Sequence, residues 1–275
     1  MKFSVTLFFL LFLCGCQKSP QIEEVDLSQY FSSINGTAVF YHPEKQMYKI
    51  YNPALSTKQT SPCSTFKIMS AYLALSEKLI SVENSQRDWN KTPYWNPQWH
   101  KNMEIIEAFQ TSCVWYFRRL IDEAGQTKTQ ALLNRYNYGN KDISDWTGSL
   151  NNNEKNPDLN GFWIESSLKI SPLEQTRVLA GIFEESGNQT AADLAKIMQV
   201  SNTPVKIYGK TGMGVKNDRI ADAWFVGFYE HDGQRIYFAL RLDDKENNQV
   251  SDYRHKASRI AKQIAITIIN NAQLF

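Results

Sequence analysis

Strand-like segments stand at both ends of the chain, and helical periodicity fills the middle. β-Branched and aromatic residues dominate 37–41 and 47–51, and they return at 205–208, 223–229 and 235–242. The spacing of apolar residues predicts helices over 64–77, 104–109, 112–124, 127–136, 172–185, 190–200 and 251–270. This order predicts an α+β fold, an antiparallel sheet flanked by helices. We expect a sheet lobe from 30–60 and 201–275, a helical insertion lobe over 65–200, and a cleft between them.

Short polar connections complete this pattern, and the composition agrees with it. Residues 42–46 and 231–234 predict hairpin turns, Gly125 is expected to end a helix, and the polar stretch 142–160 predicts a long loop. Of 275 residues, 42% are hydrophobic and 21% are charged, which excludes a disordered chain. The net charge is +2, and no basic run stands out, so a nucleic acid is not an expected partner.

The first residues predict export. Lys2 precedes an apolar run over 3–13 and the sequence Cys14-Gly15-Cys16, as in a secretory signal. The run is shorter than the roughly 20 apolar residues that span a bilayer. We therefore expect a signal peptide over 1–15 and a mature domain over 16–275 in the periplasm. The box at 13–16 also resembles a bacterial lipoprotein cleavage site, so two fates are open: release, or a lipid tether to the membrane through Cys16.

A serine and a lysine stand three residues apart in Ser64-Thr65-Phe66-Lys67, at the start of a predicted helix. Residues at i and i+3 share a helical face, so Lys67 is expected to reach the Ser64 hydroxyl. Serine is a weak nucleophile until a base takes its proton, and unpaired N–H groups at a helix start can hold an oxyanion. Alone, the pattern also fits a capping serine beside a solvated lysine.

The tripeptide Lys210-Thr211-Gly212 follows the predicted strand 205–208. Its glycine lets a flat substrate approach the strand backbone and pair with it. Lys210 offers a positive charge and Thr211 a hydroxyl to an anionic group. Alone, the tripeptide also fits a plain turn.

A second serine leads the tripeptide Ser112-Cys113-Val114, which opens a helix between the other two motifs. Its hydroxyl can relay a proton near a leaving group. The ordinary alternative is an N-cap serine, so this motif gains weight only in combination.

The three motifs in this order resemble the penicilloyl-serine transferases. The middle element departs from the S-D-N of class A and is similar to the S-x-V of class D β-lactamases, the oxacillinases. Tyr138-Gly139-Asn140 and the stretch 162–171 around Trp163 resemble the same class, as do the longer outer motifs at 62–67 and 208–212. The resemblance covers nearly the whole mature chain and implies a β-lactamase/transpeptidase-like fold.

The resemblance implies a modified lysine. In class D enzymes carbon dioxide carboxylates the S-x-x-K lysine, and the carbamate acts as general base. Carried over, Ser64 is the acylated nucleophile, Lys67 is N6-carboxylysine, and the Trp163 indole N–H is the donor that the buried carbamate needs. The amine reacts only when neutral, and burial lowers the pKa of a lysine. Apolar residues at 66, 68, 69 and 114 are expected to bury it. Carbon dioxide or bicarbonate is needed, and no other cofactor is expected.

The resemblance also implies an oxyanion hole and a carboxylate site. The backbone N–H groups of Ser64 and Met213 form the hole. Lys210, Thr211 and an arginine of the terminal helix hold the β-lactam carboxylate; Arg254 is expected there, with Arg259 as the alternative.

Other prominent residues have ordinary interpretations. Cys63 and Cys113 permit a disulfide in an oxidising compartment, but they fit two small buried hydrophobes equally well. Trp89, Trp95 and Trp99 are expected to be packing residues, although Trp99 is also a candidate roof for the cleft. The histidines are scattered and predict no metal site; they stand at 42, 100, 231 and 255.

Three functions compete. The leading one is a serine β-lactamase of class D that hydrolyses β-lactam antibiotics through a Ser64 acyl-enzyme. The second is a penicillin-binding protein that acylates without efficient turnover. The third is a β-lactam sensor domain, which we place last because such receptors carry several membrane helices and a cytoplasmic domain. Substrate range and oligomeric state stay open.

Overall fold

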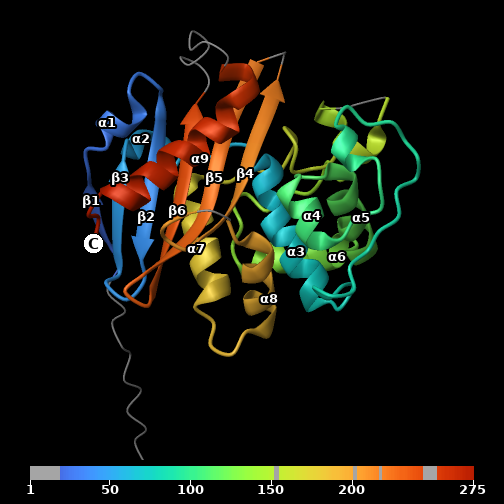
Figure 1. Ribbon diagram of the computed structural model, residues 1–275, viewed down its shortest axis with the longest axis horizontal. Coiled ribbons are helices and arrows are strands. Elements are labelled where there is room, and N and C mark those ends of the chain that lie inside the picture. Colours follow the sequence, from blue (N-terminus) through green and yellow to red (C-terminus); the bar gives the residue numbers. More distant parts are fainter. Residues whose placement is uncertain (1–18, 152–154, 201–202, 217–218, 244–252) are drawn as a thin grey trace, which may run out of the picture.

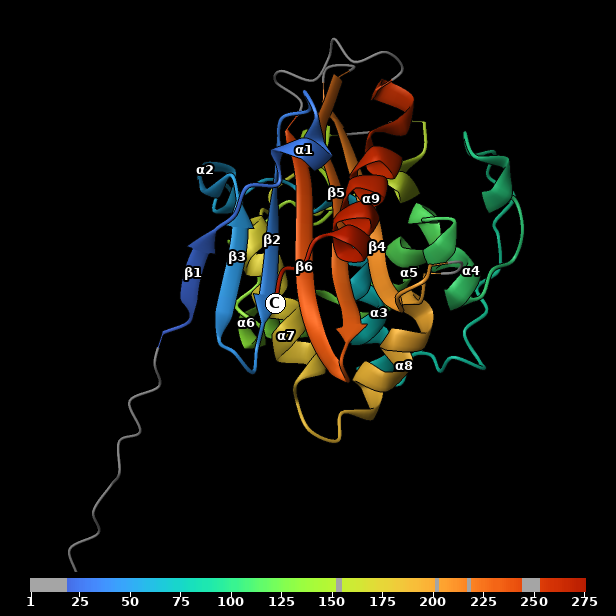
Figure 2. The same ribbon diagram turned by 60° about the vertical axis from the view of Figure 1, so that its left-hand side comes forward.

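Six strands form one sheet in the order β1-β3-β2-β6-β5-β4 (Figure 2). The computed structural model describes residues 19–151, 155–200, 203–216, 219–243 and 253–275, so the expected signal peptide and Cys16 lie outside the described residues. The predicted fold class is confirmed, with one difference: β1 pairs in parallel with β3, and every other pairing is antiparallel. The strands are β1 (Gln21–Glu24), β2 (Gly36–His42), β3 (Met47–Tyr51), β4 (Ile207–Lys216), β5 (Arg219–His231) and β6 (Gln234–Asp243).

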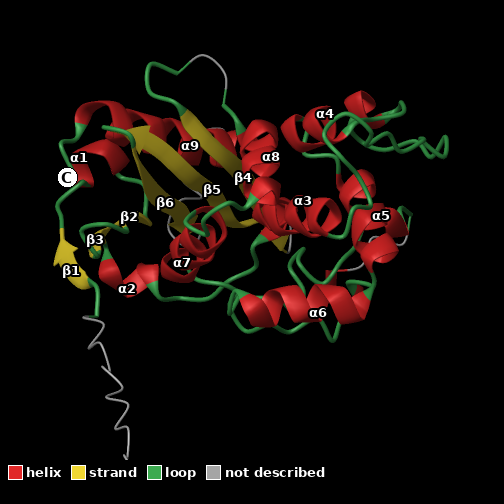
Figure 3. Ribbon diagram, turned by 90° about the horizontal axis from the view of Figure 1, so that it is seen from below, coloured by secondary structure: helices red, strands yellow, loops and turns green. Residues whose placement is uncertain are grey.

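Helices cover both faces of the sheet. Figure 3 shows α9 (Tyr253–Asn271) over one face and α7 (Pro172–Phe183) under the other. Strand β5 is therefore apolar on both sides: Trp224 joins the core that includes α7, and its neighbour Phe225 joins the core under α9. None of the helices within the described residues has the length and apolar character needed to cross a bilayer.

Helices α3, α4, α5 and α6 lie beyond β4, on the right of Figure 1, and α8 packs against α3 and β4. Helices α1 and α2 lie at the opposite edge of the sheet, on the left of the figure. The predicted helix end at Gly125 is confirmed: this residue has φ 81° between α5 and α6. At α7 the structure shows a capping box of Ser171 and Glu174, which the sequence analysis did not identify. The α-helices are α1 (Ser28–Phe31), α2 (Pro53–Ser56), α3 (Lys67–Ser76), α4 (Ile105–Gln110), α5 (Val114–Ala124), α6 (Gln126–Arg135) and α8 (Gln189–Met198). Short 3₁₀ turns are η1 (Cys63–Phe66), η2 (Pro97–Trp99), η3 (Ser149–Asn151) and η4 (Pro157–Leu159).

The predicted hairpin at 231–234 is confirmed. Asp232 and Gly233 have φ angles of 49° and 77°, and His231 pairs with Gln234. Positive φ at both central residues is what a two-residue turn between twisted strands requires. The turn therefore fixes the register of β5 against β6.

The structure corrects the local placement of all three motifs. Ser64 lies in the 3₁₀ turn η1, and the α-helix begins only at Lys67. Ser112 precedes α5 with φ 57°, so it does not open the helix. Lys210-Thr211-Gly212 lies inside β4 and not after it. Lysine and glycine are poor strand residues, which is why the sequence pattern ended the strand too early.

Three short elements were not predicted: β1, α1 and α2. All four residues of β1 are exposed, so the strand has no alternation of apolar and polar residues. The helices α1 and α2 have four residues each, too few for a helical period to show.

Candidate active site

A cleft of about 870 Å³ opens between the sheet edge and the helices. It is bounded by η1, the start of α5, strand β4 and the first half of α9. The structure brings together here six of the residues that the sequence singled out: Ser64, Ser112, Val114, Thr211, Gly212 and Met213. These residues come from three distant parts of the chain, so they meet only in the folded protein.

Lys67 and Ser64 are in direct contact. The Lys67 amine donates a hydrogen bond to Ser64 Oγ at 2.7 Å. A 3₁₀ turn stacks side chains at i and i+3 above one another, so η1 aligns the pair as well as the expected α-helix would. Lys67 is fully buried, and this burial lowers its pKa to about 8. A fraction of the amine is therefore neutral at neutral pH.

One aromatic neighbour of Lys67 was missed from the sequence. The Lys67 nitrogen lies 5.7 Å from the ring centre of Phe117, one turn into α5. No local pattern pairs these residues, because they belong to different helices. The ring adds to the apolar surroundings that keep water from the amine.

Trp163 contains an unsatisfied donor. Its side chain is fully buried, it stacks on Phe66 with 5.5 Å between ring centres, and among the described residues its Nε1 has no hydrogen-bond partner. Such a group costs about 1–3 kcal/mol, and it is uncommon enough to need an explanation. Phe66 directly precedes Lys67. An added acceptor at this place would satisfy the donor.

The second serine contacts the second lysine. Lys210 donates to Ser112 Oγ at 3.1 Å and to its neighbour's carbonyl, Thr211 O, also at 3.1 Å. Lys210 is 4% exposed, and its pKa lies well below the usual value, first because of burial and then because of Lys67 and Lys262. The contact joins the start of α5 to β4 across the cleft.

Strand β4 approaches η1 closely at Gly212. A Cβ atom at this position would lie 2.9 Å from Thr65 Cγ2 and 3.0 Å from Pro62 O. Only glycine therefore permits this spacing. Both expected oxyanion donors line the cleft: Ser64 lies in the first turn of η1, where N–H groups have no acceptor inside the helix, and Met213 follows on β4.

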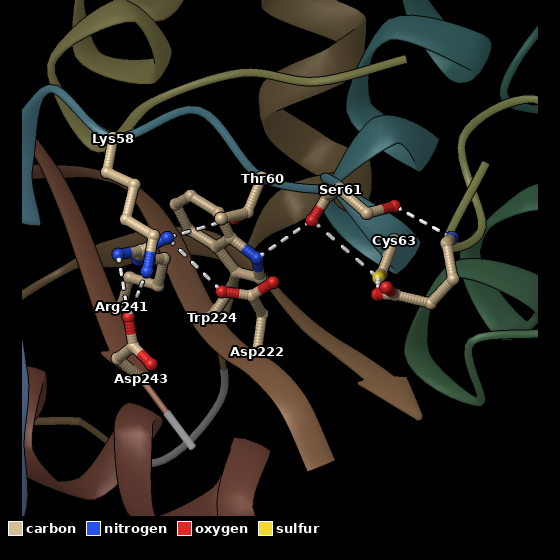
Figure 4. Close-up of polar contacts among 9 residues, drawn as sticks. Lys58, Thr60, Ser61, Cys63, Asp222, Trp224, Arg241 and Asp243 are labelled. Atoms are coloured by element: carbon tan, nitrogen blue, oxygen red, sulfur yellow. Dashed lines mark hydrogen bonds and ion pairs between the residues drawn. The ribbon is translucent and has the colours of Figure 1, made fainter. Parts of the chain in front are cut away.

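The segment before Ser64 is held by Ser61, which the sequence did not reveal. Ser61 Oγ donates to Trp163 O at 2.9 Å and accepts from Glu165 N at 2.8 Å, and Ser61 O accepts from Trp224 Nε1 at 3.1 Å. Figure 4 shows the contact between Ser61 and Trp224 beside the nucleophile turn. The same side chain thus ties the nucleophile turn to the Trp163 loop.

Behind Ser61 lies a buried ion cluster. Arg241 is fully buried and donates to Asp222 at 3.2 Å and to Thr60 Oγ1 at 3.1 Å, while Lys58 pairs with Asp243 at 2.7 Å (Figure 4). Burial raises the pKa of Asp222 to about 7 even though Arg241 opposes this. The cluster connects β5 and β6 to the chain that leads to Ser64.

Within the described part of the chain, Cys63 and Cys113 are free and buried, as the packing interpretation expects. The Cys63 thiol donates to Glu165 Oε1 at 3.1 Å, and burial places its pKa well above the usual value. Burial also raises the pKa of Cys113 to about 12. Neither thiol is therefore prone to ionise.

The rim of the cleft corrects one expectation. Trp95 is 74% exposed and lines the cleft, so it is not a core residue. Trp99 is buried, yet it also lines the cleft and packs edge-on against Trp95, with 4.9 Å between ring centres. The loop predicted over 142–160 reaches the cleft through Lys155, Leu159 and Asn160.

The arginine expected to bind the substrate carboxylate, Arg254, belongs to the terminal helix α9. Arg254 lies in the first turn of α9, but its side chain lies outside the described residues. Ser258, four residues later, lines the cleft, whereas Arg259 is exposed. Residues four apart share a helical face, so Arg254 keeps its place as the expected carboxylate ligand.

Comparisons with known proteins agree with this geometry. Residues 35–270 match the family model of the penicillin binding protein transpeptidase domain. The regulatory protein BlaR1 of Staphylococcus aureus is 34% identical over 227 residues, which cover 80% of this chain and 36% of that protein. The β-lactamase OXA-1 of Escherichia coli is 31% identical over 232 residues, which cover 82% of this chain and 79% of that enzyme.

A solved structure has the same fold as this chain. The C-terminal domain of the Bacillus licheniformis BlaR penicillin-receptor superposes with a TM-score of 0.79 at 27% identity, covering 94% of this chain and 99% of that domain. The chain spans about two fifths of the length of the regulatory proteins that it matches. The family model, by contrast, spans most of the chain. The chain therefore belongs to the penicillin-binding protein transpeptidase domain family, whose fold it shares with class D β-lactamases and with a penicillin receptor.

Proposed function

We propose that the chain is a class D β-lactamase, which hydrolyses the β-lactam amide through an acyl-enzyme on Ser64. The observation that carries the proposal is a buried lysine beside the nucleophile together with a buried indole, Trp163, that stacks on Phe66, the residue before Lys67. Lys67 contacts Ser64 at 2.7 Å with a pKa of about 8, and the nearby Trp163 indole has a donor without an acceptor. Both features suit an N6-carboxylated Lys67.

Carboxylation needs a neutral amine. The Lys67 nitrogen would attack carbon dioxide, form an N–C bond and release one proton, which leaves a carbamate with one negative charge. A buried anion of this kind needs hydrogen-bond donors, and the free Trp163 N–H is suited to supply one. The carbamate would act as the general base for both half-reactions.

In acylation, Ser64 gives its proton to the base while its Oγ bonds to the β-lactam carbonyl carbon. The backbone N–H groups of Ser64 and Met213 stabilise the oxyanion, an effect worth about 3 kcal/mol per donor. The C–N bond then breaks, and Ser112, in contact with Lys210, relays to the ring nitrogen the proton that the base took from Ser64, so the base is free again. In deacylation water gives one proton to the base while its oxygen bonds to the ester carbon, the Oγ–C bond breaks, and the base returns that proton to Ser64.

The substrate carboxylate would be held beside β4. Thr211 lines the cleft, Lys210 lies directly behind Ser112, and Arg254 belongs to the helix that closes this end. A guanidinium binds a carboxylate with two parallel hydrogen bonds. Gly212 and Val114 complete the wall on either side of the bound ring.

A second function is supported by the relatives. The regulatory protein BlaR1 and the penicillin receptor resemble this chain at 34% and 27% identity. A receptor or a penicillin-binding protein with this cleft would form the same acyl-enzyme on Ser64 but would release it slowly. The two functions therefore differ in deacylation and not in binding.

The deciding experiment measures acylation and turnover separately. Nitrocefin turnover by the wild type is expected to rise with added bicarbonate and to disappear in Lys67→Ala. Lys128→Ala, an exposed lysine paired with Glu77, serves as the matched control and should keep full turnover. A lasting penicilloyl adduct by mass spectrometry without turnover, in bicarbonate-rich buffer, would establish the receptor-type function instead. Absence of both adduct and turnover would refute both.

A further inference from the structure

A second, smaller cavity lies behind Lys210. It has a volume of about 270 Å³ and lies where the ends of α4 and α8 meet strands β4 and β5 and the helix α9. Figure 3 shows these three helices around the β4 edge of the sheet. Phe109 and Phe225 form apolar parts of its wall, and two exposed glutamines, Gln110 and Gln199, also line it. The cavity is large enough for an ion together with several waters.

The charged residues that line this cavity in the described structure are all positive. Lys210 and Lys262 both line it, and the described lining residues include no aspartate or glutamate. Within the described part of the chain, neither lysine forms an ion pair with a carboxylate. The partners of Lys210 are two neutral oxygens, Ser112 Oγ and Thr211 O. Lys262 is half-buried on α9.

This arrangement is electrostatically unbalanced. Lys67, Lys210 and Lys262 lie close enough together that Lys67 and Lys262 both lower the pKa of Lys210. Burial lowers the pKa of Lys262 as well. Buried charges in proteins are normally paired, because an unpaired one loses its hydration without compensation. Two outcomes can resolve this: the lysines lose their protons, or an anion enters.

We propose that the cavity behind Lys210 is a binding site for a small inorganic anion, held between Lys210 and Lys262. Gln110 and Gln199 line the same cavity, and their side-chain N–H groups are donors that such an ion can use besides the two cations. The cavity, of about 270 Å³, admits a halide, which as a bare spherical ion can contact two amines at once. Gluconate serves as the comparison anion, because its charge is spread over a carboxylate at the end of a long hydroxylated chain.

If the chain binds β-lactams as proposed, an anion in this cavity would also affect substrate binding through Lys210. Lys210 separates this cavity from the cleft: it lines the cavity, while its amine contacts Ser112 in the cleft. An anion at the rear keeps Lys210 protonated and therefore able to attract the carboxylate of a β-lactam at the front. The anion would thus act as a positioning element for the substrate charge.

Bromide is the direct probe. Crystals of the full chain soaked in sodium bromide are expected to show an anomalous peak within contact distance of the Lys262 amine. Crystals of Lys262→Met should lack this peak and keep the fold. The matched control is Lys196→Met, which removes an exposed lysine of α8 that pairs with Asp193 and should keep the peak.

A solution measurement separates binding from crystal soaking. Thermal unfolding is compared in sodium chloride and sodium gluconate at equal ionic strength, so that screening is the same in both. The wild type and Lys196→Met are expected to unfold at a higher temperature in chloride, and Lys262→Met should show no difference between the salts.

These measurements do not depend on β-lactam turnover. The anion site can therefore be refuted while the β-lactamase proposal stands, and the β-lactamase proposal can be refuted while the anion site stands. A cavity without a bromide peak overturns the inference. So does a chloride effect that persists in Lys262→Met. A peak without any chloride effect in solution would show an adventitious ion only, and this too overturns it.

Discussion

Replacing Trp163 with phenylalanine tests the role of its unpaired indole. The substitution keeps an aromatic ring against Phe66 but removes the only polar atom of the side chain. A hydrogen bond to a charged group contributes about 1.5–3 kcal/mol. If the indole holds a carbamate on Lys67, Trp163→Phe should weaken carboxylation by about 10- to 150-fold.

The assay is a bicarbonate titration of nitrocefin turnover, read as the concentration that gives half of the maximal rate. Carbamate formation is followed in parallel by carbon NMR with labelled bicarbonate. Trp115→Phe is the matched control, because Trp115 is equally buried but its Nε1 already donates to Trp99 O at 3.1 Å. The control should lose stability and keep the wild-type bicarbonate dependence. An unchanged half-saturation in Trp163→Phe would refute the reasoning.

Three other predictions concern stability and fit. Without carbon dioxide, the free energy of unfolding should rise by about 3 kcal/mol between pH 8 and 10.5 through Lys67 alone. In this range the folded protein has lost the Lys67 proton (pKa about 8), whereas the unfolded chain still keeps it (pKa 10.5). Denaturant titrations at several pH values should show a smaller rise in Lys67→Met. Gly212→Ala, whose Cβ would lie 2.9 Å from Thr65, should cost about 1–3 kcal/mol by denaturant unfolding and slow acylation by penicillin in stopped flow. Arg241→Met should cost about 3–5 kcal/mol in the same unfolding assay because Asp222 stays buried without its guanidinium, whereas Arg135→Met, at an exposed pair, should cost less than about 1 kcal/mol.

The fold was predictable to the extent that it depends on local patterns. Aromatic and β-branched runs located β2, β3, β5 and β6. Strands β2, β5 and β6 are covered on both faces and must be apolar, whereas β3 alternates between buried and half-buried residues. The turn at Gly233 and the helix end at Gly125 were predictable because both need positive φ. The type of the turn at Ser64 was not, since 3₁₀ and α-helical turns carry the same apolar spacing over four residues.

The residues of the three motifs were predictable from the sequence, whereas the residues that hold them in place were not. The contact between Ser64 and Lys67 follows from a spacing of three residues. Ser61 contacts residues more than a hundred positions away, and Lys262 reaches its cavity from the last helix. Contacts of this kind are created by packing between distant segments, and no periodicity in one sequence encodes them.

Strand β4 lies at the margin of the sheet, and in the described sheet β5 is its single neighbour. A margin with free backbone groups invites any extended chain to add itself, including another copy of the same protein. The turn η1 packs on the face of β4 at Gly212 and so helps to hold this strand in place. Partial loosening of η1 would therefore free β4 to pair with another chain along its open edge, and we expect heated samples to aggregate before the rest of the sheet melts. The molecule would then be inactivated irreversibly, at a rate set by protein concentration.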